Sequence, residues 1–169
     1  MSNSQKGFTL IELVVMSLIT ALLAAVVTVN FRSIRHQQEL QRGVNETISK
    51  IREVQNYVLT GQIRAGGEPA QAYVINFNTL ATAYTVSYIT PGATTTLEVV
   101  NLPVKTEIKQ VYVNGSPRTS ADVRFESPFG QITVGGAGNQ VVLLDINHKI
   151  LNFIRTIRID GISGRIGQQ

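Results

Sequence analysis

A single carboxylate, Glu12, stands at the edge of the most apolar stretch of this 169-residue chain. The next 19 residues, from Leu13 to Phe31, contain no charged side chain. A stretch of about 18 or more such residues can cross a bilayer as a helix, and a lone carboxylate in lipid costs several kcal/mol. We therefore expect Glu12 to need a cationic partner, and its chemistry to be charge neutralisation.

Other side chains that could do chemistry are few and scattered. The chain has no cysteine, which excludes disulfides, thiolate metal ligands and a cysteine nucleophile. The two histidines, His36 and His148, are not paired at ligand spacing, and we expect both to be exposed to solvent. Asp145 and Asp160 flank the predicted last strand with no base beside them. The sequence thus predicts a protein that is not an enzyme and has no cofactor and no metal ion.

The apolar run is the first element that must position Glu12. It could be the core of a secretory signal peptide, with Lys6 as its basic end and Ala24-Ala25 as its cleavage site. Such a core spans only about 7–15 residues, and a signal peptide has no use for Glu12. The sequence therefore favours a helix over residues 8–31 that spans a membrane.

The residues around Glu12 form a specific pattern: Lys6-Gly7-Phe8-Thr9-Leu10-Ile11-Glu12-Leu13. These eight positions resemble the processing and methylation motif of the type IV pilin and pseudopilin superfamily. The resemblance implies cleavage between Gly7 and Phe8 by a membrane-embedded prepilin peptidase, which removes a leader of residues 1–7. It also implies N-methylation of Phe8 and a role for Glu12 in filament assembly.

Cleavage after Gly7 would create the cation that Glu12 needs. In one continuous helix Phe8 and Glu12 are four residues apart and share a face, so the new amine would lie near the carboxylate. The resemblance implies that Glu12 meets the amine of a neighbouring subunit instead. The implied partners are the prepilin peptidase and N-methyltransferase, other pilin or pseudopilin subunits, an inner-membrane assembly platform and membrane lipid.

An amphipathic stem is predicted to follow the apolar run. Apolar residues recur mostly every three or four positions, which indicates a helix with one apolar stripe: Ile34, Leu40, Val44, Ile48, Ile51, Val54 and Val58. No proline occurs before Pro69, and Gly61 is a suitable stop. We therefore expect one helix over residues 9–60, of which 32–60 form the stem. Gly43 is its only internal weak point.

Residues 61–169 are predicted to form a β-rich head that covers the stripe. Val, Ile, Thr and Tyr dominate short runs between Gly- and Pro-containing turns. The predicted strands are 72–77, 84–89, 96–102, 107–113, 122–126, 131–134, 140–146 and 150–159, with 94–96 at a hairpin tip. No helical run alternates with them, so the predicted fold class is α+β, with a long helix on an antiparallel sheet.

The last third carries a second resemblance. Val123-Arg124-Phe125-Glu126-Ser127-Pro128-Phe129-Gly130 precedes a final pair of strands that ends at Gly164-Arg165-Ile166. This is similar to the minor pseudopilin group that includes the type II secretion H subunit and FimT-like minor pilins, apart from one extra residue before Pro128. Some FimT-like proteins bind DNA through Gly-Arg-x-Arg, whose second arginine is absent here. Arg155, Arg158 and Arg165 are the candidate DNA contacts, so nucleic acid is an alternative partner.

Together these features predict a structural subunit of a type IV pilus or a type II secretion pseudopilus, of the minor kind. The resemblance implies a bacterial inner-membrane protein with one span and its head outside the cytoplasm, although the arginines after the span do not favour this orientation. Two alternatives stay open. The head could bind DNA in natural transformation, or the chain could be a membrane-anchored β domain that never polymerises.

Overall fold

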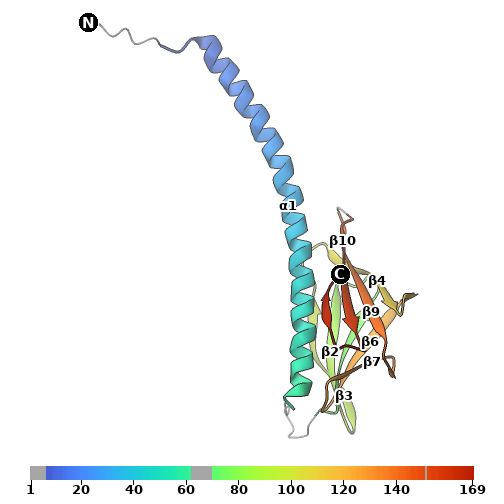
Figure 1. The fold of residues 1–169 in the computed structure, drawn as a ribbon. Helices are drawn as coiled ribbons and strands as arrows, with labels where there is room; N and C mark the ends of the chain where they lie inside the picture. The colour runs from blue at the N-terminus through green and yellow to red at the C-terminus, as the bar shows by residue number, and fades with distance from the viewer. Residues whose placement is uncertain (1–6, 62–69, 151) are drawn as a thin grey trace. The chain divides into compact units, whose positions relative to one another are not determined.

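The computed structural model describes residues 7–61, 70–150 and 152–169, with the backbone but not the side chains of residues 26–33. The chain divides into two compact units, Met1–His36 and Gln37–Gln169. Helix α1, Leu10–Leu59, contributes to both (Figure 1). Most of the predicted leader and the predicted loop at residues 66–69 lie outside the described residues.

The helix ends are defined by local hydrogen bonds. Thr9 precedes the first helical residue, and its carbonyl accepts the N–H of Leu13 at 3.2 Å. At the other end Gly61 adopts a φ of 61°, the left-handed conformation that glycine adopts at little cost, and its N–H reaches the carbonyl of Val58. Gly61 is therefore the stop that the sequence predicted. Within the residues described, no helix is both long and apolar enough to cross a membrane.

Two antiparallel sheets follow the helix in the second unit. The first has the order β3-β2-β1-β6-β7-β8 and the second the order β11-β10-β9-β4-β5 (Figure 1). The strands of the first are β1 (Ala72–Asn78), β2 (Ala83–Thr90), β3 (Ala93–Asn101), β6 (Ser120–Glu126), β7 (Gln131–Val134) and β8 (Ala137–Gly138). Those of the second are β4 (Thr106–Val113), β5 (Ser116–Arg118), β9 (Val141–His148), β10 (Ile154–Asp160) and β11 (Ile166–Gln168). The α+β class is confirmed.

The head differs from the sequence prediction in three respects. It has two sheets instead of one, and residues 94–96 lie inside β3, so the tip of that hairpin is at Pro91-Gly92. The short strands β5, β8 and β11 were not predicted. They contain Ser-Pro-Arg, Ala-Gly and Ile-Gly-Gln, which have little intrinsic strand preference. Pairing with a stronger neighbouring strand holds each of them, and a local pattern does not show this.

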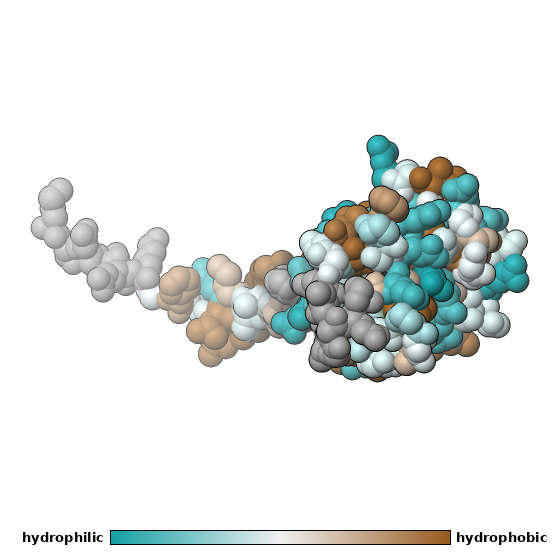
Figure 2. All heavy atoms as spheres, turned by 90° about the horizontal axis from the view of Figure 1, so that it is seen from below, coloured by the Kyte–Doolittle hydropathy of each residue, from teal (hydrophilic) through white to brown (hydrophobic). Residues whose placement is uncertain are grey.

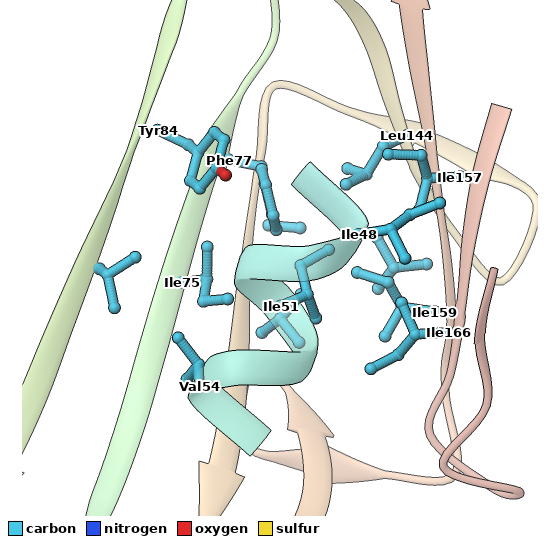
Figure 3. Packing of buried hydrophobic residues seen from close by; sticks show 14 of the residues in the cluster. Ile48, Ile51, Val54, Ile75, Phe77, Tyr84, Leu144, Ile157, Ile159 and Ile166 are labelled. Atoms are coloured by element: carbon cyan, nitrogen blue, oxygen red, sulfur yellow. The ribbon is translucent and has the colours of Figure 1, made fainter. Parts of the chain in front are cut away.

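The core lies where the helix meets both sheets. Ile48, Ile51 and Val54 of α1 point toward Ile75, Phe77 and Tyr84 of the first sheet on one side (Figure 3). On the other side they face Leu144, Ile157, Ile159 and Ile166 of the second sheet. The predicted stripe from Leu40 to Val58 is buried, whereas Ile34 is exposed. Apolar burial on both sides of the helix is the main stabilising contribution to this unit.

Gly43 has a packing reason that the sequence did not show. It is buried, and a Cβ at this position would lie 3.0 Å from Cδ of Pro103. The absence of a side chain lets the loop before β4 approach the helix closely. Gly43 therefore weakens the isolated helix but permits a contact of the folded head.

Candidate functional site

The start of α1 carries a reciprocal capping arrangement built by Thr9 and Glu12. The backbone N–H and the hydroxyl of Thr9 both donate to Oε2 of Glu12, each at 2.9 Å. The backbone N–H of Glu12 donates in return to the Thr9 hydroxyl at 3.3 Å. This is a capping box, in which a Thr and a Glu three residues later satisfy the free N–H groups of the first turn.

The capping box gives the carboxylate of Glu12 hydrogen-bond donors within its own chain. In the single chain these donors are the backbone N–H and the hydroxyl of Thr9, so the carboxylate is hydrogen-bonded before any cation binds. Both of these bonds end on Oε2, so Oε1 can accept another donor while the cap stays intact. The sequence signal was present in Thr9-Leu10-Ile11-Glu12 ahead of an apolar run, but the role of Thr9 was not predicted.

Phe8 lies outside the helix, contrary to the expectation that Phe8 and Glu12 share a helix face. The helix begins at Leu10, so the i, i+4 geometry does not apply to this pair. The Phe8 side chain is 85 % exposed. It lines a shallow hollow beside Glu12, together with Ile11, Val15, Met16 and Ile19. A cation could therefore approach Glu12 across an apolar surface.

Residues 7–25 are exposed throughout, although most of them are apolar. Figure 2 shows apolar side chains at the surface of the N-terminal part of α1. Large apolar side chains from Phe8 to Leu23 are between 47 % and 85 % exposed. Such a continuous apolar surface is typical of a segment that is covered by lipid or by other protein chains.

Comparison with known proteins identifies this N-terminus. Residues 2–28 match the model of the prokaryotic N-terminal methylation motif. The resemblance to the type IV pilin and pseudopilin superfamily is confirmed. The motif supports a type IV pilin-like protein that is processed by prepilin peptidase and assembles with other pilin subunits. No curated protein and no solved structure matches the chain, and the minor pseudopilin or FimT-like subtype is not confirmed.

The structure brings only two of the three candidate DNA-binding arginines together. Arg158 and Arg165 line one surface pocket, and Arg155 is not part of it. The pocket also contains Arg52 of α1, which was not predicted to lie there and which donates to the carbonyl of Ile166 at 2.8 Å. The side chain of Arg158, followed by the N–H of Ser163, lowers the pKa of Asp160 to about 2.

His148 is buried, contrary to the predicted exposure. It lies at the end of β9 with its side chain 0 % exposed, and its Nε2 is 3.4 Å from Oε2 of Glu39 on α1. Its Nδ1 accepts the N–H of Ile150 at 3.4 Å. His36 is half-buried.

Proposed function

We propose that this chain is a minor pilin-like subunit of a type IV pilus or a type II secretion pseudopilus. In this proposal it is cleaved between Gly7 and Phe8, methylated at Phe8 and packed into a filament through the apolar surface of α1. The observation that carries the proposal is the position of the methylation motif on a fully exposed apolar helical segment. Such a surface needs lipid before assembly and neighbouring stems afterwards.

The proposal places the chain in the bacterial inner membrane through residues 8–31, with the head outside the cytoplasm. A side-by-side array of stems would then cover the side chains that are exposed in the single chain. The inner-membrane assembly platform would extract each subunit from lipid. The second unit stays outside this contact because its own apolar stripe is already buried against the two sheets.

Glu12 would act in assembly through its second oxygen. Thr9 occupies Oε2, and the methylated amine of Phe8 from a neighbouring subunit would bind Oε1. Neutralising the carboxylate removes the cost of carrying its charge in an apolar environment, so paired subunits are favoured over single ones. The same contact would fix the axial offset between neighbours.

Mass spectrometry of the chain purified from a bacterium with a prepilin peptidase tests the processing step. The expected mass lacks residues 1–7 and carries one additional methyl group on Phe8. Gly7→Ala is expected to block cleavage, and Gly92→Ala is the matched control. A Cβ at either glycine meets no atom within 4 Å, so neither change disturbs the packing. An uncleaved wild-type chain would refute the proposal.

Three variants separate the charge of Glu12 from its capping role. Glu12→Gln retains an acceptor for Thr9 but removes the charge, whereas Glu12→Leu removes both. Each is expected to be cleaved normally and to be depleted from the sheared filament fraction. Thr9→Val loses both hydrogen bonds of the Thr9 hydroxyl, the one to Oε2 of Glu12 and the one from the N–H of Glu12, but keeps the charge of Glu12. It is expected to stay in filaments. Normal incorporation of Glu12→Gln would show that the charge has no role.

DNA binding by the head is the second candidate function. It is favoured by the pocket in which Arg52, Arg158 and Arg165 come together. Phosphate contacts by a few arginines give weak binding that falls steeply with salt. Arg165→Gln should then weaken binding of the processed chain to duplex DNA, and Arg155→Gln, outside the pocket, is the control. Equal effects of both variants would exclude a site in this pocket.

A further inference from the structure

Three loops at one end of the second unit, and the first residue of β10, carry exposed apolar side chains. We call Leu80, Val104, Ile150, Phe153 and Ile154 the apolar loop cluster. Leu80, Val104 and Ile150 are 69 %, 79 % and 57 % exposed, and the other two are about 40 % exposed. The cluster is apart from the core, whose members are nearly all fully buried.

Backbone hydrogen bonds join these loops into one surface. The N–H of Leu80 donates to the carbonyl of Ile108 just after the second loop, and the N–H of Leu102 in that loop donates to Thr82 in the first. The N–H of Lys149 donates to the carbonyl of Lys105 at 2.8 Å, which ties the third loop to the second. The three loops are therefore joined through their backbones at one end of the unit.

Leu80 is held in an unusual conformation for an apolar residue. Its φ is 63°, in the left-handed region that glycine and asparagine adopt more readily than leucine. An exposed leucine in this conformation stabilises neither its own turn nor the core. Its exposed side chain is therefore available for a contact outside the folded head.

The cluster lies at the end of the unit into which α1 enters. Pro103, in the second loop, lies close to Gly43, and His148, the last residue of β9 before the third loop, lies 3.4 Å from Glu39. Phe31, the last residue of the apolar run, is only six residues before Gln37. An extended chain spans at most about 3.6 Å per residue, so the start of this unit cannot be farther than about 22 Å from Phe31 in any arrangement.

Two lysines give this surface its charge. Lys105 and Lys149 flank the apolar tips of the second and third loops, and Lys149 is paired with Glu107 at 3.0 Å. Among the residues described, no ion pair is found for Lys105. Apolar side chains next to a lysine suit a bilayer surface with anionic headgroups, where the apolar groups enter the interface and the ammonium group of Lys105 meets phosphate.

We propose that the apolar loop cluster docks the head onto the surface of the membrane that holds the span, before the subunit enters a filament. This inference rests on the membrane insertion in the proposed function. We assign lipid as the occupant because Gln37 is within about 22 Å of Phe31 along the chain and because the exposed side chain of Val104 is next to Lys105 in sequence. Docking would hold the single subunit in a fixed orientation, and extraction into the filament would release it.

The absence of cysteine allows a direct test with single cysteines. Val104→Cys and Phe153→Cys are labelled with an environment-sensitive fluorophore in the full chain, reconstituted in vesicles of phosphatidylglycerol and phosphatidylethanolamine. Both labels are expected to shift to shorter emission wavelength and to be quenched by spin-labelled lipid. Ala93→Cys is the control, because it lies beyond the far end of β2, about 24 Å along that strand from Ala83.

A label at Ile19→Cys separates this inference from the proposed function. If Ile19 is in lipid while Val104 and Phe153 stay in water, docking is wrong and membrane insertion stands. If the Ile19 label also stays in water, insertion fails and docking fails with it. If the cluster labels shift without vesicles and in proportion to protein concentration, a second copy of the chain covers the surface, and lipid docking is wrong.

A pair of matched variants tests the cause of the shift. Leu80→Asn places a residue that accepts positive φ and removes an apolar tip, so the thermal midpoint should not fall while the Phe153 label moves toward water. Ile162→Asn removes an equally exposed apolar side chain, also 69 % exposed, from the turn after β10. It should leave the Phe153 label in lipid. Equal effects of the two variants would overturn the assignment.

Discussion

Replacing Ile51 by alanine tests the central packing claim, that the helix is held between two sheets. Ile51 is 0 % exposed, and its side chain lies in the cluster that joins α1 to both sheets (Figure 3). Deleting three carbons from such a site costs the lost transfer free energy and a term for the cavity left behind, together about 2–5 kcal/mol. Since rigid strands flank the site on two sides, it can collapse little. We therefore expect about 3–5 kcal/mol.

The assay is urea unfolding of the full chain in detergent micelles, followed by far-ultraviolet circular dichroism of the strands. The matched control is Leu59→Ala, a similar deletion on the same helix at a side chain that is 55 % exposed. Its expected cost is about 1 kcal/mol or less, because only part of the side chain leaves water on folding. The slope of the free energy against urea should be the same in both variants.

The comparison with Leu59 decides the outcome. If Ile51→Ala loses no more stability than Leu59→Ala, the helix is not packed between the sheets. Ile51→Val provides a smaller step on the same side chain, with an expected cost of about 0.5–1.5 kcal/mol. A valine variant as unstable as the alanine variant would show that the shape of the site, and not the apolar volume, controls stability.

Three further predictions follow from particular contacts. Gly43→Ala should destabilise the chain despite a helix propensity gain of about 1 kcal/mol, because its Cβ would lie 3.0 Å from the ring of Pro103. Urea unfolding measures the change in stability, and adding Pro103→Ala should recover the stability that is lost. Burial raises the pKa of Tyr84 to about 12, so stability should fall as the pH rises from about 10, the unfolded value, through 12. Tyr84→Phe should lose that alkaline dependence in thermal melts. The pKa of Asp160 is lowered, so its ionised carboxylate stabilises the folded chain. This contribution to stability is complete above about pH 4 and is lost as the pH falls through about 2. Asp160→Asn should be less stable than the wild type at pH 6 and equal to it near pH 2.

Each of these has an outcome that contradicts it. A Gly43→Ala variant that gains stability would mean that Pro103 moves aside at no cost. An unchanged alkaline transition in Tyr84→Phe would assign that transition to other groups. A stability difference for Asp160→Asn that persists at pH 2 would mean that its hydrogen bonds to the turn do not depend on ionisation.

The sequence alone determined the features that depend on neighbouring residues. The motif around Gly7, Phe8 and Glu12 is a contiguous pattern, and the family model recognises it without any structure. The stripe from Leu40 to Val58 follows from helical periodicity, which is a property of the local backbone. The α+β class follows from the change from helical periodicity before Gly61 to short strand-forming runs after it. The roles of Gly7, Phe8 and Glu12 stay predictions.

Sequence reasoning did not use one local signal that was present. Thr9 and Glu12 have capping-box spacing, which is typical of a helix that begins after Thr9 and not at Phe8. A helix start is decided by which residue satisfies the first N–H groups, and here that residue is Thr9.

Only the tertiary structure decided the contacts between distant segments. His148 is buried because β9 ends against α1 beside Glu39, and Arg52 reaches the last hairpin because the stem lies next to β11. The division of the strands between two sheets, and the existence of β5 and β8, depend on partners far along the chain. Local propensity is a property of a few residues, whereas burial and pairing are set by the whole fold, and no single segment encodes them.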